Sequence, residues 1–170
     1  TLWFRDEYPF ELLKKRLLPE FKGQRTPLKI WSAASSSGQE PYSIAMAIYE
    51  YQQSNPGAFA AGVQIIGTDI SNTMLEHCKY AHYDSLSLSR GLSLERKKKF
   101  FEAGDNGMLK VKDVIKKMVS FRQLNLLNSY SLMGRFDLVF CRNVLIYFSS
   151  ALKKQIISQI HGTLNNDRYL

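Results

Sequence analysis

The chain has 170 residues, of which 45% are hydrophobic and 22% charged; these values fit one folded domain and exclude a disordered chain. No apolar run approaches the roughly 18 residues that span a bilayer, and no secretory signal opens the chain, so we do not expect direct membrane insertion. The net charge of +8 favours an acidic partner: nucleic acid, an anionic membrane or an acidic protein. Since it starts at Thr1 and ends within an apparently unfinished segment, we expect the chain to be part of a longer protein.

The positive charge is concentrated between Arg90 and Lys117, where nine basic residues stand against four acidic ones and supply +5 of the +8. This stretch is either a solvated face or a binding surface, and the sequence leaves both interpretations open. The two cysteines, Cys78 and Cys141, each lie in an apolar stretch without zinc-ligand spacing. They indicate reduced, buried thiols in a cytoplasmic protein, and we expect no metal site.

The first half of the chain alternates helical and strand patterns. Apolar residues at helical spacing predict a helix from Phe10 to Phe21, which Pro19 is expected to end near Leu18. We then expect a buried strand, a loop of small residues, a helix opened by a proline and a second buried strand, at residues 28–34, 35–39, 41–53 and 63–68. Ser71 can cap the next helix, over residues 72–80.

The second half continues the alternation, with strands at residues 118–124 and 136–141. Ser149 can cap a last helix over residues 151–164, and Tyr169 looks like the start of a fifth strand. This order predicts an α/β fold with a doubly wound, mostly parallel sheet. The departure is at residues 84–117, where the turn Asp105-Asn106-Gly107 predicts a small β-hairpin insertion.

Ligands of such sheets bind beyond the carboxyl ends of the strands, which directs attention to residues 35–40, 69, 125–127 and 142–147. The small-residue loop lets the backbone approach a ligand, although an ordinary strand-to-helix turn has the same composition. Asp69 could accept hydrogen bonds from both hydroxyls of a ribose, or could cap a helix. Asn125 and Asn143 could contact a cofactor or act as turn residues.

Five stretches then stand out together: Thr1-Leu-Trp-Phe-Arg5, WSAASSSGQEPYSIAM (Trp31 to Met46), Gly67-Thr-Asp-Ile70, Asn125-Leu-Leu127 and FDLVFCRNVLIYF (Phe136 to Phe148). In this order, and over nearly the whole chain, they resemble the chemotaxis receptor methyltransferases, the CheR family. The resemblance implies a Rossmann-like sheet of the class I S-adenosylmethionine-dependent methyltransferases. Residues 1–170 would be a catalytic domain truncated at both ends, with S-adenosyl-L-methionine as cofactor and S-adenosyl-L-homocysteine as product.

The family's cofactor contacts carry over to Thr1, Arg5, Glu40, Asp69, Asn125, Leu126, Asn143 and Val144. Tyr147 matches a tyrosine near the transferring methyl group. Arg5 and Tyr147 are therefore the candidate catalytic residues, as orienters of the cofactor or of a substrate carboxylate. Ala34 and Ser35 stand where many members have Gly and Cys, and Gln39 where many have Glu; we do not expect these changes to abolish binding.

The resemblance also implies the reaction: methylation of glutamate side chains on the cytoplasmic helices of chemotaxis receptors, giving methyl esters. A glutamate carboxylate is already ionised at pH 7 because its pKa is about 4.3, so no general base is required, and no His lies in the four ligand loops. One alternative is a nucleic-acid methyltransferase, which the charge supports but no aromatic platform accompanies. Another is a cofactor-binding regulatory module without catalysis.

In this family the hairpin insertion docks the receptor, and some members use it to grip a peptide at the receptor's tail. Those members resemble one another in a longer, glycine-containing turn. Residues 101–111 here leave room for a short turn alone. We therefore predict a protein that recognises receptor helices without depending on a tail peptide and that does not bind nucleic acid.

Overall fold

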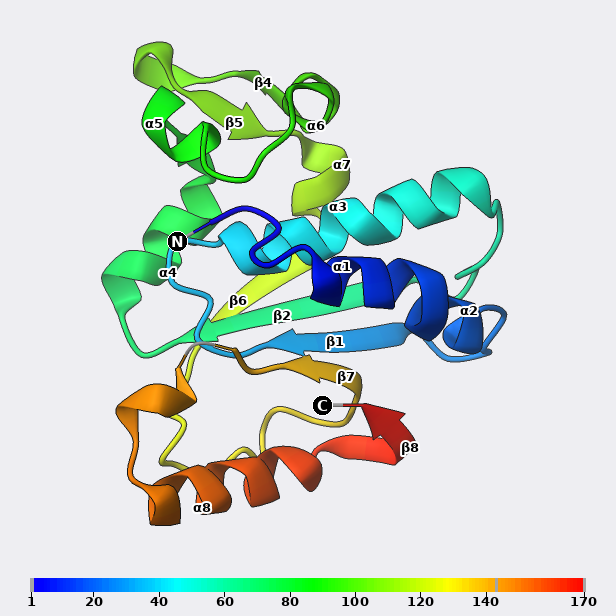
Figure 1. Cartoon of the computed structure of the whole chain (residues 1–170), viewed down its shortest axis with the longest axis vertical. Helices are drawn as coiled ribbons and strands as arrows, with labels where there is room; N and C mark the ends of the chain where they lie inside the picture. Colours follow the sequence, from blue (N-terminus) through cyan, green and yellow to red (C-terminus); the bar gives the residue numbers. More distant parts are fainter. Residues whose placement is uncertain (1, 143, 170) are drawn as a thin grey trace.

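The computed structural model describes residues 2–142 and 144–169, with side chains described as far as residue 165. Figure 1 shows a central sheet with helices on both faces and a smaller subdomain beside it. The elements of the main body are α1 (Tyr8–Leu12), η1 (Leu13–Leu17), α2 (Leu18–Phe21), β1 (Leu28–Ser32), α3 (Gln39–Ser54), β2 (Val63–Asp69), α4 (Asn72–Tyr80), β6 (Val119–Gln123), β7 (Phe136–Phe140), η3 (Leu145–Tyr147), α8 (Ser150–His161) and β8 (Leu164–Tyr169).

The central sheet has five strands in the order β6-β2-β1-β7-β8, and each neighbouring pair is parallel. At its centre Ile30 of β1 lies between Ile65 of β2 and Leu138 of β7. The chain moves outward from β1 in both directions, so the strand order reverses between β1 and β7. The predicted doubly wound parallel sheet is confirmed, and a ligand is expected at this reversal.

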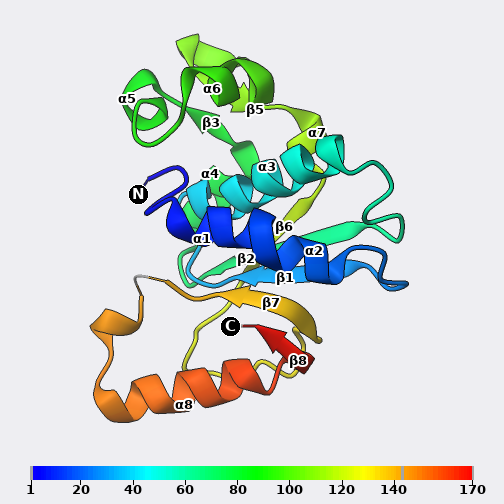
Figure 2. The same ribbon diagram turned by 45° about the vertical axis from the view of Figure 1, so that its right-hand side comes forward.

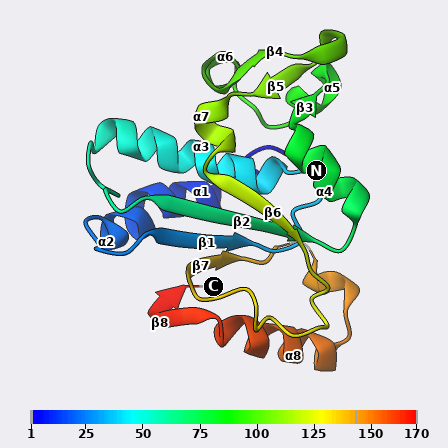
Figure 3. The same ribbon diagram turned by 180° about the vertical axis from the view of Figure 1, so that it is seen from behind.

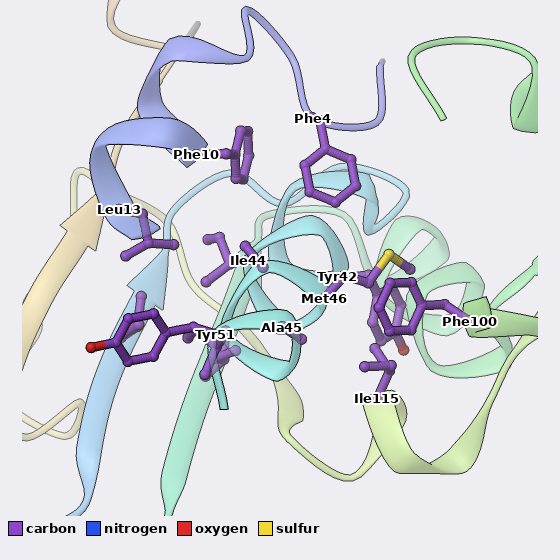
Figure 4. Packing of buried hydrophobic residues seen from close by; sticks show 14 of the residues in the cluster. Phe4, Phe10, Leu13, Tyr42, Ile44, Ala45, Met46, Tyr51, Phe100 and Ile115 are labelled. Atoms are coloured by element: carbon purple, nitrogen blue, oxygen red, sulfur yellow. The ribbon is translucent and has the colours of Figure 1, made fainter. Parts of the chain in front are cut away.

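Residues on the two faces of the sheet form two separate cores. Ile30 packs on one face with the helices α1 to α3, and its neighbour Trp31 packs on the other face with Ile156 and Ile160 of α8. Figure 2 shows the two helical layers on opposite sides, and Figure 4 shows the first core around α3. This alternation follows from the pleat, because successive side chains of a strand point to opposite faces.

The helical segment at the start of the chain runs further than predicted. Pro19 was expected to end it near Leu18, but the helix continues to Phe21. The turn before the proline, Leu13–Leu17, is a π-helix. A π-turn is wider than an α-turn, so the turn before Pro19 leaves room for the proline ring. It also shifts the hydrogen-bond pattern, so that no donor is needed at the proline nitrogen. The helix is also kept in place by Leu13, Leu18 and Phe21, all fully buried.

The capping predictions are confirmed, and the predicted end of the last helix is wrong. Ser71 and Ser149 accept hydrogen bonds from Met74 N and Leu152 N and so cap α4 and α8. The last helix ends at His161 rather than near residue 164, and β8 begins at Leu164 rather than at Tyr169. The cause lies outside the segment: the guanidinium of Arg135 binds the carbonyl oxygens of Gly162 and Leu164, which fixes the turn between helix and strand.

The insertion between β2 and β6 contains the predicted hairpin and one more strand. Its elements are β3 (His82–Tyr83), α5 (Ser85–Leu88), α6 (Leu94–Phe100), β4 (Phe101–Ala103), η2 (Asp105–Gly107), β5 (Leu109–Val111) and α7 (Asp113–Lys116). The hairpin β4–β5 is antiparallel. β3 pairs with β5 on the edge opposite β4, also in antiparallel orientation. Figure 3 shows this subdomain beside α3. Phe100, Phe101 and Ile115 belong to the same core as α3, so the insertion packs onto the main body.

The described part of the chain contains no helix that is both long and apolar enough to cross a membrane.

Candidate active site

A pocket lies at the carboxyl edge of the sheet, where β1, β2 and β7 end and the N-terminal segment crosses over them. Its volume is about 380 Å³. It is lined by Leu2, Arg5, Ala34, Ser35, Ser36, Glu40, Asp69, Arg142, Val144 and Tyr147. The pocket thus brings together five of the residues predicted from the sequence, Arg5, Glu40, Asp69, Val144 and Tyr147, from four separate segments of the chain.

The loop between β1 and α3 forms the floor of this pocket in a tightly wound conformation. Ala34, Ser36 and Gly38 have φ angles of 57°, 51° and 101°, in the region that favours glycine. At Gly38 a side chain is also excluded by space, since a Cβ would lie 2.9 Å from the hydroxyl of Tyr83. The small residues noted in the sequence are therefore needed for the shape of the loop.

Neighbouring elements hold the carbonyl groups of this loop. The hydroxyl of Tyr83 donates to Ser37 O at 2.6 Å, and the thiol of Cys78 donates to Ser36 O at 3.0 Å. Burial raises the pKa of the Cys78 thiol to about 12 and raises the pKa of Tyr83 well above its usual value, so both groups keep the protons that they donate. Cys78 is buried and unpaired, as predicted, while Cys141 is half-buried.

Asp69 ties the end of β2 to the loop. One carboxylate oxygen accepts from Ser36 N and the other from Ser71 N, both at 2.9 Å. The residue thus organises two backbone segments, and it also lines the pocket. Each carboxylate oxygen has a further lone pair, so these bonds leave acceptors for a ligand hydroxyl.

Glu40 places a second carboxylate on the pocket wall. Ser32 donates a hydrogen bond of 2.8 Å to Glu40 Oε1, and the guanidinium of Arg142 lies 3.9 Å from Glu40 Oε2. Burial raises the pKa of Glu40 above its usual value, and the bond from Ser32 and the charges of Arg142 and Arg5 oppose this only in part. A cationic ligand group beside Glu40 would lower this pKa again, because it favours the ionised carboxylate.

The same pocket also carries positive charge. Arg5 lies on the N-terminal segment and is exposed, and Arg142 follows β7 with 17% of its side chain exposed. Tyr147 lies on η3, with 78% exposure, at the mouth of the pocket. The site therefore offers two carboxylates, two guanidinium groups and an exposed phenol around one cavity.

Two further predicted residues that the structure describes lie outside the pocket. Asn125 accepts from Leu127 N at 2.9 Å, and Leu126 is buried in the core beneath α8; neither lines the pocket, and their assignment as cofactor contacts stays a prediction. Thr1 and Asn143 fall outside the described residues. Arg142 belongs to the predicted ligand loop at residues 142–147, but no role was predicted for it; the structure places it on the pocket.

Comparisons with known proteins agree with these observations. The family model described as CheR methyltransferase, SAM binding domain, matches residues 1–170. A chemotaxis protein methyltransferase of Vibrio parahaemolyticus is 56% identical over 170 residues, covering 100% of this chain and 62% of the relative. Chemotaxis protein methyltransferase 1 of Pseudomonas aeruginosa is 56% identical over 174 residues, covering 100% of this chain and 63% of the relative.

The chain thus spans less than two thirds of the length of these curated relatives. Among solved structures, PKMT2 from Rickettsia typhi has a TM-score of 0.53 and 17% identity, over 99% of this chain and 25% of that one. At this identity the likeness concerns the fold alone. The family match over the whole chain, by contrast, settles the relationship that the motifs predict: the chain belongs to the CheR methyltransferase family and corresponds to its S-adenosylmethionine-binding domain.

Proposed function

We propose that the full-length protein transfers a methyl group from S-adenosylmethionine to glutamate side chains on the cytoplasmic helices of chemotaxis receptors. The observation that carries this proposal is the pocket at the carboxyl edge of the sheet. It combines two carboxylates, Glu40 and Asp69, with two guanidinium groups, Arg5 and Arg142. The family membership and the names of the relatives support it. We expect the reaction to take place in the cytoplasm, where these receptor segments lie.

The residues of the pocket suit the cofactor's chemistry. S-adenosylmethionine carries a sulfonium, an ammonium, a carboxylate and a ribose diol. Asp69 would accept from the ribose hydroxyls, and the desolvated carboxylate of Glu40 would face the cationic part. The small residues Ala34 to Ser36 let the backbone come close to the ligand.

The chain's contribution to methyl transfer is alignment and exclusion of water. The bound cofactor supplies a methyl group activated by its sulfonium. The acceptor glutamate is already ionised near pH 7, so no proton has to be removed, and the described lining residues include no histidine. Arg5, and Tyr147 at the mouth of the pocket, would orient the acceptor carboxylate. A carboxylate oxygen held about 3–3.5 Å from the methyl group would form the ester bond as the bond from methyl to sulfur breaks, leaving S-adenosylhomocysteine as a neutral thioether.

Chemical stability of the product tests this proposal. The full-length protein is incubated with receptor and with cofactor labelled in its methyl group, and the product is treated with alkali. A glutamyl methyl ester releases labelled methanol, whereas methylated amines and nucleobases keep their label. Retention of the label would contradict the proposal and support the nucleic-acid alternative, and absence of transfer with intact cofactor binding would support the regulatory module.

The hairpin turn bears on how the receptor is found. Two backbone hydrogen bonds close the connection between β4 and β5: Gly104 N donates to Met108 O, and Met108 N donates to Asp105 O. Asn106 and Gly107 within it adopt φ angles of 55° and 75°. This compact turn supports a protein that does not depend on a receptor tail peptide. We expect no binding of tail peptides in calorimetry and equal methylation of intact and tail-deleted receptors. Micromolar peptide binding, or loss of methylation on tail deletion, would contradict this expectation.

A further inference from the structure

The N-terminal segment crosses the pocket in an unfavourable backbone conformation. Phe4, Asp6 and Glu7 have φ angles of 47°, 66° and 46°, which residues with side chains rarely adopt. Arg5, the predicted orienter, stands in the middle of them. Such a segment keeps its shape only where tertiary contacts fix it, and strained segments of this kind concentrate at functional sites.

One group of contacts fixes the segment on the side of the insertion. The backbone N–H of Trp3 donates to Arg90 O at 2.9 Å. The indole of Trp3 packs edge-on against Tyr83 and Phe101, with ring centroids 4.9 and 5.3 Å apart. Phe4 N donates to the hydroxyl of Ser43 at 3.0 Å. These contacts hold the residues before Arg5. Beyond Arg5 the backbone N–H groups of Glu7 and Tyr8 donate to Phe4 O and Asp6 O, while the Arg5 carbonyl and the Asp6 carboxylate are held from β7.

Arg142 supplies the second group of contacts. Its Nη2 donates to the carbonyl oxygen of Arg5 at 2.8 Å and to Asp6 Oδ2 at 3.0 Å. Its Nη1 is buried, lies 3.9 Å from Glu40 Oε2 and has no hydrogen-bond partner among the described residues. One guanidinium therefore connects the end of β7, the N-terminal segment and the Glu40 wall of the pocket.

We infer that Arg142 is a positioning residue that holds Arg5 over the pocket through the Arg5 carbonyl and the Asp6 carboxylate. The planar guanidinium suits this task because it binds both oxygens in a fixed direction. Arg142 acts on the reaction through Arg5, so its effect on catalysis depends on the Arg5 side chain being present. This inference rests on the proposed methyl transfer, in which Arg5 orients the acceptor.

The test is a double-mutant cycle in the full-length protein, with Arg142→Gln, Arg5→Gln and the double variant. We expect Arg142→Gln alone to lower kcat/KM about 100-fold, the usual effect of a reacting group displaced by about 1 Å. In the Arg5→Gln background the same change is expected to lower it less than about threefold. Arg142→Lys, which can keep one of the two hydrogen bonds, is expected to fall between Gln and wild type.

Arg135→Gln is the matched control. Arg135 stands before β7 as Arg142 stands after it, and its guanidinium also binds two oxygens, the carbonyls of Gly162 and Leu164. Its loss is expected to lower the thermal stability without the dependence on Arg5. If Arg142→Gln lowers kcat/KM by the same factor with and without Arg5, the positioning role is refuted.

A second measurement does not require methyl transfer. Amide hydrogen exchange at residues 3–7 is expected to accelerate at least tenfold in Arg142→Gln and to stay unchanged in Arg135→Gln. Unchanged exchange in Arg142→Gln would overturn the inference even if the enzyme is active. If exchange is faster in Arg142→Gln but the wild-type protein transfers no methyl group to receptor, the proposed function is refuted and the anchoring by Arg142 remains.

Discussion

Ala34 carries a side chain in a backbone conformation that favours glycine, with a φ of 57°. The left-handed conformation costs a residue with a Cβ about 1–2 kcal/mol, and the greater freedom of glycine in the unfolded chain returns part of that. We therefore expect Ala34→Gly to raise the free energy of unfolding by up to about 1 kcal/mol in urea titrations. Ala33→Gly is the control: Ala33 is buried and has no positive φ, so its change is expected to destabilise, and equal losses at both positions would contradict the argument.

Asp69 should show its importance in cofactor affinity. Removing a hydrogen bond from a charged group costs about 1.5–3 kcal/mol, so we expect Asp69→Ala to weaken binding of S-adenosylhomocysteine roughly 10- to 150-fold in calorimetry. Asp84→Ala removes an aspartate that caps α5 away from the pocket, and it is expected to leave the affinity unchanged. Unaltered affinity in a folded Asp69→Ala protein would remove this residue from the site.

Glu40 is expected to make stability depend on pH. Because burial raises its pKa in the folded protein above the ordinary value of 4.5, ionisation of Glu40 costs stability, and the loss grows as the pH rises through the raised pKa. Glu40→Gln keeps an acceptor for Ser32 and has no charge. We expect this variant to be more stable than wild type near pH 7, with the difference vanishing below about pH 4.5, in denaturant titrations at both values. A difference that does not change with pH would show that desolvation of Glu40 is not its cause.

At the scale of elements, Glu50 connects three helices. This residue of α3 accepts two hydrogen bonds from Arg96 of α6 and one from Lys14 of η1. Burial alone would raise the pKa of Glu50, but the bonds from Arg96 and Lys14 outweigh it and lower the pKa. The pH dependence is opposite to that of Glu40: the stabilisation by Glu50 is present above the ordinary pKa of 4.5 and is lost as the pH falls through the lowered pKa.

We expect Glu50→Gln to lower the free energy of unfolding by about 1–2 kcal/mol near pH 7, with a smaller loss in acid. Glu11→Gln is the control, since Glu11 pairs with Lys15 at 4.0 Å on an exposed helix face, where such pairs contribute little. An equal loss of unfolding free energy in both variants would argue against a stabilising role of the contacts of Glu50 with Arg96 and Lys14.

Elements set by local signals could be predicted from the sequence, and those set by distant contacts could not. Ser71, Ser149 and the Asn106-Gly107 turn act within a few residues of themselves, and the structure confirms all three. The helical spacing of apolar residues reaches Phe21, but continuation of the helix past Pro19 depends on burial of Leu18 and Phe21, which follows only from the tertiary fold.

The same limit applies to the site. The positions of Asp69 at the end of β2 and of Glu40 in the first turn of α3 could be located because strands and helices alternate along the chain. The role of Arg142 could not, because its partner Asp6 is 136 residues away in the chain and Arg5 is 137 away. A residue that meets its partners only through the tertiary fold leaves no periodic signal.

At the scale of the whole molecule, the charge of the insertion is expected to govern association with an acidic receptor. Lys98 and Lys99 of α6 are exposed in a stretch that supplies +5 of the net +8. We expect the double change Lys98→Glu and Lys99→Glu to slow association with receptor at least tenfold at low salt, with the effect shrinking as salt is added. Lys22→Glu with Arg25→Glu alters the total charge equally at exposed positions after α2, and it should slow association much less. Equal effects would indicate a role for net charge alone.

The strand order also determines when the pocket can exist during folding. β1, β2 and β6 are neighbours that the first 123 residues supply, whereas β7 must join β1 across a long closure: Lys29 and Asp137, which share a hydrogen bond, are 108 residues apart. Long-range parallel pairing is slow, so we expect the β7–α8–β8 part to dock after β1, β2 and β6 have paired. The pocket needs Arg142, Val144 and Tyr147 from that part, and a growing chain on the ribosome therefore acquires it only after these residues have emerged. The cofactor can then stabilise the sheet once β7 has docked on β1, and it cannot assist the earlier half in folding.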